Sequence, residues 1–143
     1  MKDVSFENAI SYLLQQIPEI RDFYERRCVE LYAQGLADVV FGSILVEYLT
    51  ITADEGADSE ADSAANTITR IFEMIEDLAT SSDFNTRCLV EVSVLESILG
   101  EEGGLKRFGS YMGRQTRAMA SALAKRWELN EELDEIQPDG QKP

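Results

Sequence analysis

Histidine is absent from this 143-residue sequence, and its absence removes several classes of enzyme at once. It is the commonest general base and transition-metal ligand near neutral pH. Ser-His-Asp sites, Cys-His sites and His-Glu-x-x-His zinc sites are therefore excluded. A phosphate-binding loop is missing too, because Gly100, Gly103 and Gly104 lack both a preceding strand and the Lys-Ser or Lys-Thr pair. We expect no catalytic residues, no metal site and no cofactor.

Cysteines and long apolar runs are also scarce. Cys28 and Cys88 lie 60 positions apart, with no Cys-x-x-Cys pair. We expect two buried free thiols, with a disulfide or a reactive thiol as the alternative. No apolar stretch approaches the roughly 20 residues of a membrane helix, and the first residues are amphipathic and charged rather than an apolar signal region. We therefore expect a cytoplasmic protein without a membrane partner.

The charge that is present is distributed unevenly. The 27 acidic residues outnumber the 13 basic ones, which gives a net charge of −14. Residues 1–104 hold 21 acids and 6 bases, whereas residues 105–127 hold six bases and no acid. Such a surface attracts basic partners and repels nucleic acid and anionic membranes over most of its area.

Apolar residues recur with the helical period almost throughout, which predicts an all-α fold. The expected helices cover about residues 5–17, 18–35, 38–52, 64–79, 84–100 and 105–128. Their inward stripes include Leu31 and Tyr32 in the second helix and Trp127 in the last. The fifth helix carries apolar residues on several sides and is expected to be the most buried. Gly109 and Gly113, four positions apart, indicate a close helix crossing in the last one.

The helices predict a single helical domain over residues 1–128. Within it, residues 53–65 combine small and acidic residues without a bulky hydrophobe, so we expect a mobile acidic loop. Residues 129–143 form an acidic C-terminal tail that we expect to be frayed.

The acidic loop also suggests a calcium site, because Asp58, Glu60 and Asp62 alternate like the start of an EF-hand. Position six would be Ser63 instead of glycine, and position twelve would be Thr69 instead of glutamate, which disfavours a specific site.

Two charged helix faces have alternative interpretations. Glu73, Glu76 and Asp77 share one face of the fourth helix, either as a solvated surface or as a partner-binding surface. The basic residues of 105–127 can dock on the acidic helices of the same chain, bind nucleic acid, or contact the acidic face of a second copy. We expect no direct nucleic-acid binding, because repulsion from the rest of the molecule opposes it.

Residues 66–99 resemble one unit of the HEAT-like helical repeats. The segment Asn66–Ala79 would be the first helix, and Asp83 with Arg87 would open the second. Phe84 and Thr86 depart from the proline and valine that the family prefers. The resemblance implies a short stack of helical hairpins, and an irregular bundle of about six helices is the alternative.

The whole chain resembles small, acidic, all-helical bacterial proteins, some of which are immunity proteins of polymorphic toxins. This resemblance rests on size, charge and stretches such as Val40-Phe41-Gly42. It implies cytosolic binding to a toxin.

Together these observations predict a non-catalytic protein that neutralises a basic partner by occlusion, as an immunity protein against a nucleic-acid-targeting toxin does. Attraction between opposite charges would raise the association rate by about 10–10³-fold. The alternatives are a helical scaffold or adaptor subunit with exposed apolar patches, and a phage-type DNA mimic; a homodimer is also possible. The predicted partner-binding residues are Asp54, Glu55, Asp58, Glu60, Asp62, Glu73, Glu76 and Asp77.

Overall fold

The computed structural model describes residues 3–58 and 61–129, and all their side chains except those of residues 57, 58, 61 and 62. All regular secondary structure in these residues is helical, which confirms the predicted fold class. None of the described helices is both long enough and apolar enough to span a bilayer. The elements are η1 (Phe6–Asn8), α1 (Ala9–Gln16), η2 (Pro18–Ile20), α2 (Arg21–Leu31), α3 (Ala37–Val39), η3 (Val40–Leu45), α4 (Val46–Asp58), α5 (Ala61–Ala79), α6 (Phe84–Cys88), η4 (Leu89–Leu95), α7 (Glu96–Leu99), α8 (Gly104–Phe108), η5 (Gly109–Tyr111) and α9 (Arg114–Arg126).

Several of these elements join end to end, so the described residues form seven helical segments. Elements α3, η3 and α4 make one continuous helix, called here helix 37–58, and α6, η4 and α7 make helix 84–99. The middle of each, η3 and η4, is wound as a π-helix, and these two segments pack against each other. Gly42 lies at this crossing, where an added Cβ would come 3.1 Å from the Ser93 carbonyl oxygen.

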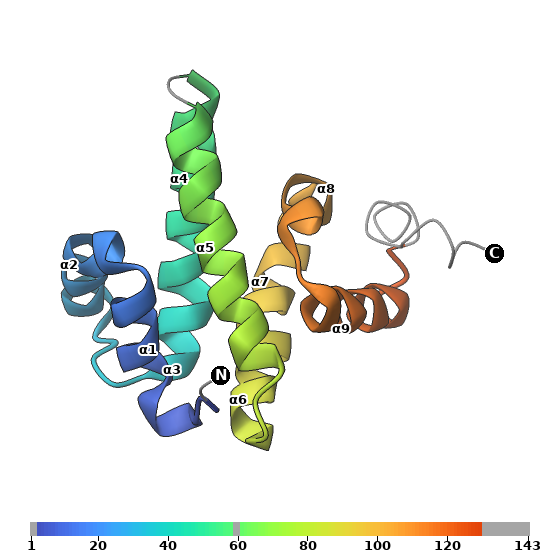
Figure 1. The fold of residues 1–143 in the computed structure, drawn as a ribbon, viewed down its shortest axis with the longest axis horizontal. Coiled ribbons are helices and arrows are strands. Elements are labelled where there is room, and N and C mark those ends of the chain that lie inside the picture. Colours follow the sequence, from blue (N-terminus) through green and yellow to red (C-terminus); the bar gives the residue numbers. More distant parts are fainter. Residues whose placement is uncertain (1–2, 59–60, 130–143) are drawn as a thin grey trace.

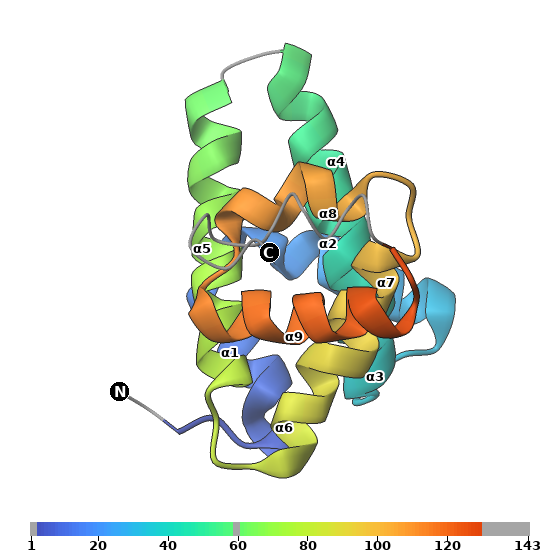
Figure 2. The same cartoon turned by 90° about the vertical axis from the view of Figure 1, so that its right-hand side faces the viewer.

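The segments are arranged in three layers (Figure 1). Helix 37–58, α5 and helix 84–99 run up, down and up in the middle. Elements α1 and α2 cover one side of this layer, and α8 and α9 cover the other. Figure 2 shows α9 crossing α5 and helix 84–99 at a steep angle. The hairpin of residues 66–99 that the HEAT-like resemblance implied is therefore present as two antiparallel helices, whereas its kinship to those repeats stays a prediction.

One hydrophobic cluster runs through all three layers. The apolar stripe of α5 is buried as predicted. Both thiols are free, Cys28 buried and Cys88 half-buried. The largest fully buried side chains are Phe41, Phe72 and Phe108, with Leu13, Ile17, Ile20, Ile44, Leu45, Leu49, Ile71, Met74 and Ile75.

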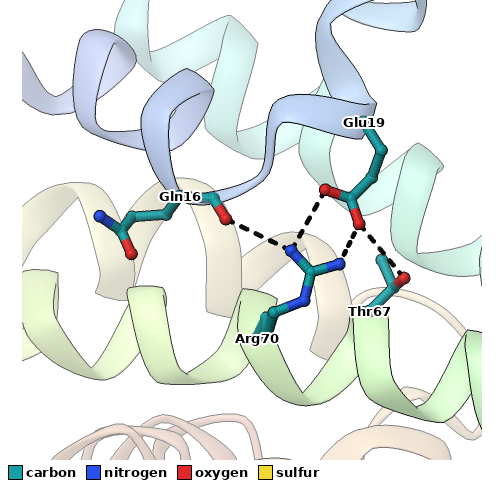
Figure 3. Close-up of polar contacts among 4 residues, drawn as sticks. All are labelled: Gln16, Glu19, Thr67 and Arg70. Atoms are coloured by element: carbon teal, nitrogen blue, oxygen red, sulfur yellow. Dashed lines mark hydrogen bonds and ion pairs between the residues drawn. The ribbon is translucent and has the colours of Figure 1, made fainter.

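A polar cluster ties the first layer to the second (Figure 3). Arg70 of α5 donates hydrogen bonds to both carboxylate oxygens of Glu19 and a longer one of 3.4 Å to the Gln16 carbonyl oxygen. Thr67 also donates to Glu19, at 3.5 Å. The Arg70 guanidinium holds the pKa of the Glu19 carboxyl below its usual value. These hydrogen bonds therefore hold the corner between α1 and α2 against α5.

Three sequence predictions about local structure are wrong. Leu31 and Tyr32 do not face the core, since their exposed fractions are 38% and 86%, and Trp127 is also exposed. The helix expected over residues 105–128 is broken between η5 and α9. The segment 53–65, expected as a loop, is helical at both ends, because α4 extends to Asp58 and α5 begins at Ala61.

The physical reason for the helical hairpin is close packing of small residues. An added Cβ on Gly56 would lie 2.4 Å from the Ala64 Cβ, so α4 and α5 touch there without a bulky side chain. The hairpin end extends past the other helices in both views (Figures 1 and 2). Of the predicted mobile loop 53–65 and the predicted frayed tail 129–143, residues 59–60 and 130–143 lie outside the described residues. Leu129 is described and packs partly buried against the core.

Candidate protein-binding surface

The acids predicted on the segment 53–65 fall at the end of the α4–α5 hairpin. Asp54 forms an ion pair with Arg107 of α8 at the molecular surface. Glu55 lines an open cavity between α4 and α5, next to Tyr48 and Thr67. Glu60 and the side chains of Asp58 and Asp62 lie outside the described residues. Of the five predicted acids, the structure thus places two, Asp54 and Glu55.

Glu76 has a structural role that the sequence pattern did not indicate. Its carboxylate accepts hydrogen bonds from the backbone N–H groups of Gln115 and Thr116, at 2.9 and 2.8 Å, and from the Thr116 hydroxyl at 2.7 Å. These groups belong to the first turn of α9, whose N-cap residue is Gly113. An anion at this position satisfies open N–H groups and interacts favourably with the helix dipole. Glu76 of α5 therefore caps α9 from outside.

Asp77 also forms a bond within the fold. It accepts a 2.6 Å hydrogen bond from the Tyr12 hydroxyl of α1. Burial, followed by this bond, raises the pKa of Tyr12 to about 12. Glu73 is exposed, whereas Glu76 and Asp77 are half-buried. The three residues share a helix face as expected, but Glu76 and Asp77 connect α5 to α9 and α1, and Glu73 is the one presented to solvent.

Much of the basic segment 105–127 docks on its own chain. Arg107 pairs with Asp54, and Arg126 pairs with Glu91 of helix 84–99. Arg117 donates to the carbonyl oxygens of Gly109 and Met112, at 3.2 and 3.3 Å. The exposed basic residues of this segment include Lys106, Arg114 and Lys125. Docking on acids of other helices thus accounts for two of its six charges, and Arg117 is bonded within the segment itself.

The structure has a groove on another part of the molecule, which the sequence pattern did not indicate. It lies between α2, helix 37–58 and α7, and its volume is about 630 Å³. Glu47, Glu96 and Glu101 contribute carboxylates to its lining, and Leu31 and Ile51 contribute apolar surface. No sequence pattern groups these acids, because Glu47 belongs to α4, Glu96 to α7 and Glu101 to the turn after α7. The i, i+4 recurrence of 42–43, 46–47 and 50–51 along one helix was the available signal.

Several apolar side chains in α2 and just after it are exposed. Leu31 lines the groove at the end of α2. Val29 and Leu36 nearby in sequence are 64% and 51% exposed. Tyr32 follows α2 with a φ of 52°, a left-handed conformation that costs a non-glycine residue about 1–2 kcal/mol. This backbone directs an aromatic ring into solvent, and tyrosine is enriched at protein interfaces.

Among the described residues, no three His, Cys, Asp or Glu side chains are grouped where they could hold a metal ion.

Neither a curated protein nor a solved structure matches the chain. Residues 10–128, most of the 143-residue chain, match the family described as Domain of unknown function (DUF7674). This small all-helical protein therefore belongs to that family.

Proposed function

We propose that this protein is a non-catalytic binding protein that neutralises a basic partner protein by occluding it. We further propose that it acts as an immunity protein against a toxin that targets nucleic acids. Toxins of that kind hold phosphates in a cationic groove, which an acidic helical surface fits in charge.

The observation that supports this proposal is that three of the six basic residues of the segment 105–127 are bonded within the chain. Its Arg107, Arg117 and Arg126 are held by partners inside the chain, so they offer little to a phosphate backbone. The net charge of −14 and the exposed Glu73 on α5 remain to attract a cation-rich partner. A basic protein fits this charge distribution better than a nucleic acid does.

One observation favours a second candidate, the helical scaffold or adaptor. Val29, Tyr32 and Leu36 expose apolar surface at the end of α2. Exposed apolar surface of this kind is typical of a docking site for another subunit. Binding through it would depend only weakly on salt.

Affinity capture from a lysate of the source organism separates the two candidates. The full chain is used as bait at ~50 mM and again at ~500 mM salt, and the retained proteins are identified by mass spectrometry. We expect one basic protein that is lost or weakened at high salt. A set of partners insensitive to salt, or retained nucleic acid, would contradict neutralisation of a basic protein.

The predicted hairpin acids are tested on the captured partner. Replacing Asp58, Glu60 and Asp62 together by serine removes three negative charges from the hairpin. We expect association to slow by about tenfold at low salt, with dissociation little changed, because distant charges act mainly on the encounter rate. Unchanged association would remove the hairpin from the binding surface, and circular dichroism checks that the variant is folded.

A further inference from the structure

The groove beside α2 has the shape of a receptor for a helix. Its floor is one face of helix 37–58, where residues recur four positions apart. Gly42 packs against helix 84–99 and Val46 is buried, whereas Ser43 and Ile51 are exposed. Arg27 and Leu31 form one wall, and α7 with the residues that follow it forms the other. The residues of the floor are Gly42, Ser43, Val46, Glu47, Thr50 and Ile51.

The dimensions of the groove suit two turns of helix. The floor runs over ten residues, from Gly42 to Ile51, and at a rise of about 1.5 Å each it extends over about 14 Å. Small residues along the far wall, Ser97 and Gly100, leave room for a second backbone to approach. Leu31 on the near wall and Ile51 on the floor are 38% and 37% exposed, and they offer the apolar contact that an amphipathic helix requires.

The charges along the groove determine what kind of helix fits. Glu47 already pairs with Arg27 on its side, at 2.9 Å. Across the groove, Glu101 receives only a long 3.5 Å hydrogen bond from Thr50, and Glu96 has no charged partner among the described residues. Three carboxylates against one guanidinium leave the groove negative. A helix with Lys or Arg beside its apolar stripe is complementary to it.

We propose that this groove binds an amphipathic, basic helix of the partner protein, with apolar side chains on Leu31 and Ile51 and basic ones toward Glu96 and Glu101. The proposal rests on the proposed function, since it assumes a basic protein partner. It identifies the binding surface and moves it away from the α4–α5 hairpin, where the sequence placed it.

A selection of displayed random peptides on the immobilised full chain tests the proposal. Peptides of about 16 residues are long enough to fill two turns with flanks on each side. We expect the enriched peptides to carry apolar residues at i, i+3 or i+4 and i+7, flanked by Lys or Arg. Enrichment without this pattern, or no enrichment, would overturn the proposal.

Matched variants then locate the peptide by fluorescence anisotropy. Ile51→Glu and the double variant Glu96→Lys/Glu101→Lys are expected to weaken the peptide about tenfold or more. The controls are Val92→Glu, an equally drastic change at an exposed apolar residue outside the groove, and Glu7→Lys on η1, and both should bind as the unchanged chain does. If the variants and the controls lose peptide affinity equally, the peptide adsorbs through general charge, and the proposal that it binds in the groove is overturned.

Two further outcomes separate this inference from the proposed function. If the partner captured from lysate binds Ile51→Glu as tightly as the unchanged chain, the groove is not the binding surface and the proposed function stands. If the unchanged chain forms a dimer in sedimentation and Ile51→Glu is a monomer, a second copy occupies the groove and the proposal fails. The thermal unfolding of each variant shows that the fold is retained, which is expected because Ile51 is 37% exposed.

Discussion

The carboxylate of Glu76 occupies the place that a capping side chain would take at the start of α9. The N-cap residue is Gly113, and an added Cβ there would lie 2.7 Å from the Glu76 carboxylate. The backbone of Gly113, with φ −74° and ψ 178°, has the extended conformation of an ordinary N-cap. Glycine at position 113 and glutamate at position 76 are thus two halves of one cap.

This arrangement predicts a rescue between the two positions. Glu76→Ala leaves the N–H of buried Thr116 without its partner, so we expect a loss of about 1–3 kcal/mol in the free energy of unfolding. Gly113→Asp alone should also destabilise, because its side chain collides with Glu76. In the double variant, the carboxylate introduced at position 113 would cap α9 in the usual way and recover about 0.5–2 kcal/mol. Urea denaturation measures all three, and strictly additive losses would contradict the shared cap.

Tyr12 makes the stability of the fold depend on alkaline pH. Its pKa is raised to about 12, first by burial and then by the bond to Asp77. The folded state therefore holds the phenol proton more tightly than the unfolded chain, whose tyrosines titrate near 10. This contribution is complete below about pH 10 and is lost as pH rises through about 12.

We expect Tyr12→Phe to cost about 0.5–1.5 kcal/mol at pH 8, from the lost hydrogen bond. Between about pH 10 and 12, its stability should also decline less steeply than that of the unchanged chain. Chemical denaturation across this window gives both quantities. Tyr111→Phe is the control, because no hydrogen bond of that hydroxyl is found in the described residues; parallel curves for all three proteins would exclude the role of Tyr12.

At the scale of elements, the junction between α7 and α8 leaves the least room for an added Cβ among the described glycines. An added Cβ on Gly104 would lie 2.0 Å from the Ile98 carbonyl oxygen, which is backbone and cannot move alone. Gly103 beside it has open space around its Cβ position and a φ of 74°. The two glycines are therefore required for different reasons.

Gly104→Ala should displace α8 from α7 and cost about 1–3 kcal/mol, as overpacking does. Gly103→Ala should cost about 1–2 kcal/mol, from its left-handed backbone alone. Unfolding free energies give the totals, and hydrogen exchange of the Leu105 and Phe108 amides separates the causes. We expect faster exchange in Gly104→Ala, and unchanged exchange there would contradict the displacement of α8.

The same scale shows why some elements could be predicted and others could not. The stripe of α5 is predictable because Ile71 and Ile75 belong to an amphipathic pattern that one helix contains by itself. The break before α9 is not, because its cap is Glu76, 37 residues earlier in the sequence than Gly113. The ends of α4 and α5 were predicted as loop because Gly56 and Ala64 carry no bulky side chain, whereas small residues allow helices to touch directly.

The candidate site, too, could be predicted from the sequence only in part. A search for clustered acids finds Glu73, Glu76 and Asp77, but two of these are used by neighbouring helices for their own bonds. The groove acids Glu96 and Glu101 are brought opposite helix 37–58 by the packing of η3 on η4. Sequence composition predicts the sign of the surface, and tertiary packing decides which carboxylates remain available.

For the whole molecule, the excess of 27 acids over 13 bases opposes compaction. The described ion pairs are all at least partly exposed and contribute only about 0–1 kcal/mol each. Screening should therefore remove more repulsion than attraction. We expect the Tm to rise when salt increases from ~20 to ~300 mM at pH 7, measured by calorimetry. A falling Tm would mean that the ion pairs outweigh the net charge.

Acidification relieves the same repulsion until it reaches the carboxylates that hold the fold together. The pKa values of Asp3, Glu19 and Asp83 lie below their usual range, mainly because of hydrogen bonds from the Ser82 hydroxyl, Arg70 and the Thr86 hydroxyl, respectively. Such groups stabilise the fold above their unfolded pKa near 4, and this contribution is lost as pH falls through the lower folded values.

Stability should therefore pass through a maximum on the acid side of neutrality. We expect the Tm to rise between pH 7 and about 5, as the net charge falls, and to drop below about pH 4. Asp83→Asn loses the anion that accepts from the Phe6 N–H and the Thr86 hydroxyl, so its acid decline should be shallower while its stability at pH 7 is lower. A Tm that falls steadily from pH 7 would show that paired carboxylates outweigh net repulsion, and the surface acids would then be structural rather than available to a partner.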